Sequence, residues 1–450
     1  MSRTSSPPAS TPAGNFGRCL LQAICLTSTL AVFSARPAAA ANTLLWFSDG
    51  RPTPVARKAT DLLAGAAEDG LNAHDYGADL LRNAIDNAAS GPAPTGDMVI
   101  QLERALTAAT RRYLADLRSG RIDPQQLDEN YNGASGPGID PDALLVSAVA
   151  EDRLPEAARS AQPPLAQYVE LREALARYRL LAGNPAWLKP LPLPADGKLQ
   201  PGQAYAGIPV LSQRLKALGD LPANGAPPAR YEGRLVDALK SFQERHGLTP
   251  DGVVGKGTLE QLNVAPEVRV RQIELALERL RWTPLLPASR AIVVNIPEFR
   301  VRAYEVRDGK VEMKVAMNII VGNAAKTRTP IFDAEMRFVE FSPYWNVPPS
   351  IARGETLPKL RREPGYFDQQ GFEFVGRDGR VVSSFSEASL DAVQRGEMRI
   401  RQRPGARNAL GDIKFIFPNP DNIYLHHTPT PQLFKRDRRD FSHGCIRVEE

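Results

Sequence analysis

The hydrophobic pattern of this chain changes its period once, just after Pro287. Before that position apolar residues recur at the three- and four-residue spacing of amphipathic helices, and after it they form short runs bounded by turn residues. No helices of crossover length alternate with these runs, which excludes a Rossmann fold and an α/β barrel. The sequence therefore predicts an α+β fold, in which helical domains precede a mainly antiparallel β domain.

The helical part is predicted to contain two domains and a connecting helix. Residues 42–200 form the first domain, in which 102–117 is a clear amphipathic helix and 185–201 a proline-rich linker. Residues 201–265 are predicted to form a compact unit of three short helices, and residues 266–286 a connecting helix.

The remaining residues, 287–450, are predicted to form the β domain. A polar, irregular segment from Leu357 to about Met398 is long enough to be an inserted lobe. The predicted strands cover residues 291–296, 301–306, 311–321, 336–342, 372–375, 413–417 and 423–425.

Residues 1–41 are predicted to be a secretory signal peptide. Arg3 and Arg18 give it a positive start, residues 19–33 are moderately apolar, and Ala38–Ala41 offers small-residue cleavage sites. An uncleaved anchor is the alternative. We therefore expect an exported protein of the periplasm or cell envelope.

Charge and hydropathy exclude two classes of partner. The 56 basic and 51 acidic residues leave a net charge of only +5, without a Lys/Arg block, so nucleic acid is not an expected partner. No apolar run approaches the roughly 20 residues of a membrane helix, so no integral membrane segment is expected in the mature chain.

The candidate chemistry lies near the C-terminus. Cys445 is the one cysteine outside the predicted signal peptide, and three of the five histidines are close to it in sequence: His426, His427 and His443. A thiolate nucleophile needs a base within hydrogen-bond reach and N–H donors for the developing oxyanion. His426 ends an apolar strand and can face Cys445 from it. The amides around His443 to Cys445 can form an oxyanion hole, because Gly444 lets the substrate approach closely.

Two other interpretations of this cluster stay open from the residues alone. A single buried cysteine is commonly a small apolar core residue. A cysteine with three histidines can also bind zinc. His443 and Cys445 are separated only by a glycine, however, and outside the predicted signal peptide no further cysteine exists to complete a structural zinc site.

The C-terminal motif resembles a known family signature. His426 followed by Ser442-His443-Gly444-Cys445-Ile446-Arg447 is similar to the signature of the YkuD-type L,D-transpeptidases. The upstream segments that fit the same family are Val294–Pro297, Thr329-Pro330, Trp345–Pro348, Gln402–Gly405, Asn408–Gly411 and Lys414-Phe415.

The chain most resembles the large exported subgroup of that family, which has a helical scaffold domain, a peptidoglycan-binding bundle and a β-rich catalytic domain. Phe242–Leu248 and Asp251–Leu262 resemble the peptidoglycan-binding domain, the alternative being a small bundle that binds nothing. Two features depart from the family pattern. His427 stands where Asp or Gly is frequent, and the chain ends at Glu450, so the catalytic domain is expected to be truncated at its C-terminus.

The resemblance implies an acyl transfer on peptidoglycan stem peptides. Cys445 would attack the carbonyl of the L-centred third residue and release the terminal D-Ala, and the thioester would then pass to an amine. His426 would be the base, oriented by the backbone carbonyl of His427. An L,D-carboxypeptidase, with water as acceptor, and a non-catalytic peptidoglycan-binding protein are the alternatives.

The resemblance also implies roles for the surrounding residues. Ser442, His443 and Gly444 would shape the nucleophile turn and the oxyanion hole, and Arg447 would bind a substrate carboxylate or fix that turn. The remaining pocket candidates are Tyr424, Trp345 and Asn346. No metal ion or organic cofactor is required.

Overall fold

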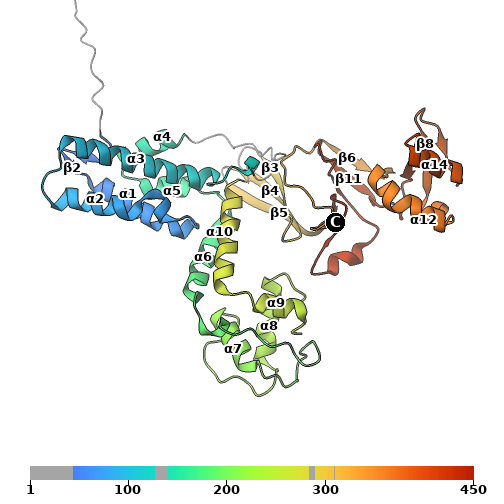
Figure 1. The fold of residues 1–450 in the computed structure, drawn as a ribbon, viewed down its shortest axis with the longest axis horizontal. Coiled ribbons are helices and arrows are strands. Elements are labelled where there is room, and N and C mark those ends of the chain that lie inside the picture. The colour runs from blue at the N-terminus through green and yellow to red at the C-terminus, as the bar shows by residue number, and fades with distance from the viewer. Residues whose placement is uncertain (1–43, 127–139, 283–288, 309) are drawn as a thin grey trace, which may run out of the picture. The chain divides into compact units, whose positions relative to one another are not determined.

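The computed structural model describes residues 44–126, 140–282, 289–308 and 310–450 (Figure 1). The predicted signal peptide, residues 1–41, lies outside this part of the chain. Among the described helices, none combines the length and the apolar character that crossing a membrane requires.

The first helical region has one contiguous hydrophobic core. In α3 the buried residues Leu102, Leu106, Tyr113 and Leu117 follow helical spacing. The helix starts earlier than predicted because the Thr95 hydroxyl caps it by accepting the N–H of Met98, and it ends at Ser119, just before Gly120. The main elements of the region are β1 (Phe47–Ser48), β2 (Arg51–Pro52), α1 (Pro54–Ala64), α2 (Ala78–Ser90), α3 (Gly96–Ser119), α4 (Pro141–Ala150) and α5 (Leu154–Ala161), and α6 (Ala166–Leu181) follows them.

The predicted three-helix unit is present and has its own core. Its helices are α7 (Ile208–Ala217), α8 (Arg234–Arg245) and α9 (Lys256–Leu262). The buried Gln243 amide donates to Asp251 Oδ1 and to the Val253 carbonyl, and it accepts the N–H of Gly252. One side chain therefore holds the turn between α8 and α9.

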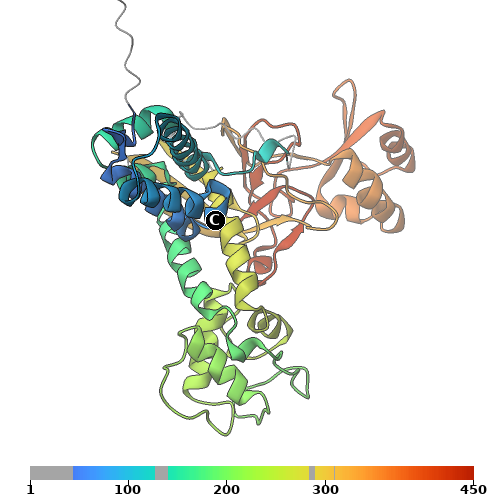
Figure 2. The same cartoon turned by 60° about the vertical axis from the view of Figure 1, so that its left-hand side comes forward.

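The connecting helix α10 (Pro266–Arg281) packs along α6, and Figures 1 and 2 show the two helices side by side. The two helices share an apolar cluster. It contains Tyr168 and Leu175 of α6, Leu165 just before α6, and Ile273 and Leu277 of α10. Residues of β3 and β5 pack against the same cluster. The α6–α10 pair thus links the first helical region to the β domain.

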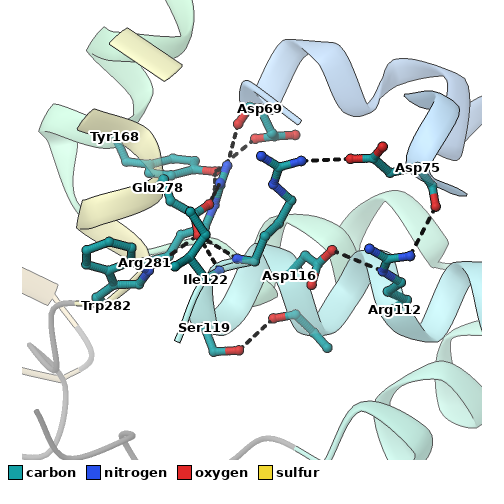
Figure 3. Close-up of polar contacts among 12 residues, drawn as sticks. Asp69, Asp75, Arg112, Asp116, Ser119, Ile122, Tyr168, Glu278, Arg281 and Trp282 are labelled. Carbon is teal, nitrogen blue, oxygen red and sulfur yellow. Dashed lines mark hydrogen bonds and ion pairs between the residues drawn. The ribbon is translucent and has the colours of Figure 1, made fainter. Parts of the chain in front are cut away.

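A buried polar cluster joins the last turn of α10 to the first helical region (Figure 3). The fully buried Arg281 guanidinium donates to the Tyr168 hydroxyl at 2.8 Å, to Glu278 Oε2 at 3.0 Å and to the backbone carbonyl of Asp69. Because a buried cation is costly without partners, these contacts fix the relation of α10 to α6 and to the segment after α1.

The second oxygen of Glu278 binds the backbone that follows α3. It accepts the N–H groups of Arg121 at 2.5 Å and Ile122 at 3.0 Å (Figure 3). Gly120 adopts a φ of +81°, and a Cβ there would lie 2.5 Å from Nε1 of Trp282. Only glycine fits this close approach of α3 to α10.

The β domain is built on one mainly antiparallel sheet, as predicted. Within the described residues its strand order is β3-β4-β5-β14-β12-β11-β6, and β13 pairs with β5 outside this path. Two pairs, β12–β14 and β13–β5, are parallel. The strands are β3 (Arg290–Asn295), β4 (Arg300–Arg307), β5 (Lys310–Gly322), β6 (Phe338–Phe341), β11 (Ile413–Ile416), β12 (Leu425–His426), β13 (Asp440–Ser442) and β14 (Ile446–Val448).

The segment predicted to be an inserted lobe is a folded lobe, and its interior is more regular than expected. It has its own hydrophobic core, in which Phe367 and Phe374 stack at 4.8 Å, and its own sheet with the order β7-β10-β8-β9. The apolar residues of this lobe are spread over several short elements, so no long periodic run revealed them. The elements are β7 (Trp345–Asn346), α11 (Pro349–Ile351), a π-helical turn (Ala352–Thr356), α12 (Leu357–Arg362), α13 (Tyr366–Gln370), β8 (Phe372–Gly376), β9 (Val381–Val382), α14 (Glu387–Arg395) and β10 (Met398–Gln402).

Candidate active site

The parallel pair β12–β14 brings Cys445 and His426 to one face of the sheet. Its register pairs Leu425 with Ile446 and His426 with Arg447. Paired residues of neighbouring strands project to the same face, and residues two apart in a strand share that face. Continuing the register by one step from Leu425 therefore places Tyr424 beside Cys445, with His426 diagonal to the thiol.

The Cys445 thiol is half-buried at the start of β14. Burial raises its pKa, while hydrogen bonds from the backbone and the hydroxyl of Tyr424 and the positive charges of Lys414 and Arg447 oppose that shift. Sγ lies 3.8 Å from the backbone carbonyl of Asn422. The group at rest is therefore a neutral thiol at pH 7.

His426 is only 4% exposed, and its ring is oriented by the backbone. Nδ1 lies 2.5 Å from the carbonyl oxygen of His427, which can only accept, so Nδ1 carries the proton. Nε2 is then the nitrogen with the lone pair. Burial and the neighbouring Arg447 charge lower the pKa of His426 to about 4, although the carbonyls of His427 and Leu410 favour the protonated ring. The imidazole is thus neutral at pH 7.

The turn that presents Cys445 is held by hydroxyl groups. The Ser442 hydroxyl donates to the carbonyl of Cys445 at 2.5 Å and accepts the N–H of Gly444 at 3.2 Å. The fully buried Thr329 hydroxyl donates to the carbonyl of Gly444 at 2.7 Å and accepts the N–H of Gly322 at 2.8 Å. Gly444 has a φ of +120°, a conformation that favours glycine.

Of the three amides expected around the oxyanion hole, that of Gly444 is already bonded to the Ser442 hydroxyl. The amides of His443 and Cys445 are therefore the better candidates for oxyanion donors. The His443 side chain has a different contact: Nε2 lies 2.6 Å from Oε1 of Glu355 in the π-helical turn of the lobe. His443 thus ties the lobe to the nucleophile turn.

The two pocket candidates from β7 differ in their relation to the thiol. The Trp345 side chain hydrogen-bonds to the Tyr424 hydroxyl, which in turn contacts Cys445. Asn346 is exposed and pairs with Arg401 of β10. The described contacts do not connect Asn346 with Cys445. The structure therefore brings Trp345, but not Asn346, to the site.

The sequence argument gave Lys414 no place in the site, although it lies on the catalytic face. The β11–β12 register pairs Lys414 with His426, and its Nζ lies 4.2 Å from the ring centroid of Tyr424. The signal for such a residue is positional, since it depends on which strand pairs with β12. As for metals, the described part of the chain has no group of three or more His, Cys, Asp or Glu residues placed to hold an ion.

Comparisons with known proteins agree with this arrangement. Residues 289–450 match the model of the L,D-transpeptidase catalytic domain, residues 38–175 that of a scaffold domain, and residues 206–262 that of a "Putative peptidoglycan binding domain". The chain is 34% identical over 182 residues to a "Putative L,D-transpeptidase" of Haemophilus influenzae. That match covers 40% of this chain and 35% of the relative, so the chain spans about a third of the relative's length. The chain therefore contains a YkuD-type L,D-transpeptidase catalytic domain, a scaffold domain and a peptidoglycan-binding domain.

Proposed function

We propose that this protein is a peptidoglycan L,D-transpeptidase that forms a thioester between Cys445 and a stem peptide and transfers the acyl group to an amine, thereby cross-linking the cell wall. The observation that carries the proposal is the placement of Cys445 and His426 on one face of adjacent strands. The ring orientation of His426, with its lone pair on Nε2, supports a role as base.

In the first half-reaction, His426 Nε2 takes the proton of Cys445 as Sγ attacks the carbonyl carbon of the third stem residue. The resulting oxyanion is stabilised by the amides of His443 and Cys445. The C–N bond then breaks, and the leaving amine of D-Ala receives the proton from His426. The thioester remains on Cys445.

In the second half-reaction, an amine of a neighbouring stem attacks the thioester carbonyl. His426 accepts a proton from that amine, and the C–S bond breaks as Cys445 regains a proton. Water in place of the amine would make the enzyme an L,D-carboxypeptidase by the same steps. The peptidoglycan-binding domain supports peptidoglycan as the partner and the cell envelope as the site of action.

The test is to incubate the full chain with a tetrapeptide donor, with and without an amine acceptor. Wild type is expected to release D-Ala and to yield a cross-linked product only when the amine is present. Cys445→Ala should abolish both the product and the acyl mass adduct, and circular dichroism controls for its folding. Release of D-Ala without cross-linked product would identify the carboxypeptidase. Absence of any adduct in folded wild type would favour a non-catalytic wall-binding protein.

A further inference from the structure

Two threonine hydroxyls hold the backbone of the nucleophile turn from one side. Oγ1 of Thr327 donates to the carbonyl of Ser442 at 2.8 Å. Oγ1 of Thr329 donates to the carbonyl of Gly444 at 2.7 Å. The Ser442 carbonyl also accepts the N–H of Asn323 at 3.0 Å. The segment 323–329, which follows β5, therefore fixes the direction of two carbonyls of the turn.

The close approach of this segment to the turn requires a glycine at position 322. A Cβ there would lie 2.7 Å from the nitrogen of Thr329, 3.0 Å from Cα of Gly444 and closer still to the carbonyl oxygen of Thr327. The Gly322 N–H also donates to the Thr329 hydroxyl at 2.8 Å. Because a hydroxyl has one proton and an amide N–H can only donate, the proton of Thr329 is directed at the Gly444 carbonyl.

Each held carbonyl shares a peptide unit with one of the two candidate oxyanion donors. The Ser442 carbonyl belongs to the same peptide unit as the N–H of His443. The Gly444 carbonyl belongs to the same peptide unit as the N–H of Cys445. In a planar trans peptide unit the C=O and N–H bonds point in opposite directions. Both N–H groups therefore point away from the segment 323–329, and neither has a hydrogen-bond partner among the described residues.

We propose that Thr327 and Thr329 are positioning residues for the oxyanion hole. Thr327 aims the N–H of His443. Thr329 does the same for the N–H of Cys445. A hydrogen bond to the carbonyl also polarises the N–H of the same peptide unit, which makes it a stronger donor. The inference rests on the proposed function for the existence of the oxyanion, and it requires neither threonine to touch the substrate.

The kinetic test separates binding from acylation in the full chain. Thr327→Val and Thr329→Val each replace a hydroxyl by a methyl group. Removing an oxyanion donor lowers kcat by roughly 10²–10³-fold, so a donor that is present but misdirected should slow acylation by a carbapenem about ten- to a hundredfold. The Kd of the carbapenem before acylation and the pH profile set by His426 should not change. Thr327→Ser and Thr329→Ser keep the hydroxyl and should restore most of the rate.

A nuclear magnetic resonance measurement reports on the two amides without any reaction. The chain has three cysteines and five histidines, so ¹⁵N labelling of these two residue types gives few backbone resonances, which single substitutions assign. Thr327→Val should shift the amide resonance of His443 most. Thr329→Val should shift that of Cys445 most, because each substitution removes the hydrogen bond on one peptide unit.

Thr110→Val is the matched control. Thr110 is fully buried, as Thr329 is, and its hydroxyl donates to the Leu106 carbonyl at 2.8 Å within α3. This substitution should change neither the acylation rate nor the two amide resonances. Circular dichroism checks the folding of every variant. If Thr329→Val does not fold, Thr327→Val decides, because the Ser442 carbonyl keeps its second donor.

Three results would overturn the positioning role. They are unshifted amides in the folded valine variants, shifted amides with an unchanged acylation rate, and equal slowing by Thr110→Val. Absence of acylation in folded wild type would overturn the proposed reaction instead. The amide shifts would then decide by themselves whether the two threonines aim the N–H groups.

Discussion

His426 and His427 are neighbours in sequence but contribute different groups to the site. His426 offers its ring, whereas His427 acts through its backbone carbonyl, 2.5 Å from Nδ1 of His426. His426→Ala should therefore slow acylation by a carbapenem roughly 10²–10⁴-fold, the usual effect of losing a general base. His427→Ala keeps the carbonyl and should cost far less. Time-resolved intact-protein mass spectrometry measures both rates, and equal loss in the two variants would show that the base is wrongly assigned.

The burial of His426 leads to a second prediction, which concerns the pH dependence of acylation. A neutral imidazole is required to accept the thiol proton, and the pKa of this ring is lowered to about 4 by burial and by the charge of Arg447. An ordinary histidine would lose this neutral form as the pH falls through about 6.5. We therefore expect acylation through His426 to remain level from pH 8 to 5 and to fall only near pH 4.

The same profile is measured for His426→Ala, so that the uncatalysed thiolate reaction, which increases with pH, can be subtracted. The pKa of Cys445 is raised by burial, so this background should be small at neutral pH. An inflection near pH 6.5 that depends on His426 would contradict a buried, neutral base.

The sequence predicted which residues gather around Cys445 better than it predicted the contacts that surround them. Cys445, His426 and the carbonyl of His427 were accessible because a short motif carries them. Lys414 and Thr329 belong to segments that resemble the family, but their contacts in the site were not predicted, because these depend on which strands pair and in which register. A one-residue change of register would turn Lys414 to the opposite face. The hydrophobic pattern of a sequence indicates where a strand lies, but it does not indicate which other strand pairs with it.

At the level of elements, the positions of most helices and strands followed from apolar periodicity. The helix predicted over 102–117 lies within α3 (Gly96–Ser119), and the strand predicted over 301–306 is observed at Arg300–Arg307. An inserted lobe and one of its strands, 372–375, were predicted, but its other elements were not, because its core combines Phe367, Phe372 and Phe374 from short elements that are adjacent only after folding. The residues of such a core are not regularly spaced in the sequence, so hydrophobic periodicity does not reveal them.

The contact of α10 with the first helical region should depend strongly on Glu278. Removing this carboxylate leaves the fully buried Arg281 without its anionic partner and the N–H groups of Arg121 and Ile122 without an acceptor. Glu278→Ala is therefore expected to destabilise the fold by about 3–5 kcal/mol. Urea denaturation followed by circular dichroism gives this value.

Glu274→Ala provides the comparison on the same helix. Glu274 pairs with Arg179 at 2.8 Å, but both side chains are about one-third exposed, so the loss should be about 1 kcal/mol or less. Equal effects of the two substitutions would show that the buried cluster adds nothing beyond a surface ion pair. Glu278→Gln, which keeps one carbonyl acceptor, should fall between them.

On the scale of the whole molecule, the proposed wall-binding function and the proposed reaction belong to two regions that have separate hydrophobic cores. The core of the three-helix unit has no residue in common with that of the main sheet, and an exposed hydrogen bond of 2.8 Å joins Thr249 of the unit to Asp437 of the β domain. Replacing residues 206–262 by a flexible linker should therefore reduce sedimentation with purified peptidoglycan. Acylation of Cys445 should persist.

Circular dichroism and wild-type acylation kinetics serve as controls for that deletion. Sedimentation unchanged by the deletion would assign the three-helix unit a purely structural role. Loss of acylation in a folded deletion variant would instead show that the unit supports the β domain, with the Thr249–Asp437 contact as the first candidate for the connection.

The parallel pairing of β12 and β14 has a consequence for how distant relatives can be detected. Parallel neighbours need a long crossover, and here the chain leaves β12, passes the 3-10 turn Pro431–Lys435 and β13, and returns as β14. The backbone ladder, and not the length of this excursion, sets the separation of His426 and Cys445. Insertions between the two motifs therefore need not alter the site, and a pattern search that allows a gap of variable length there would retrieve homologues that a fixed-spacing search loses.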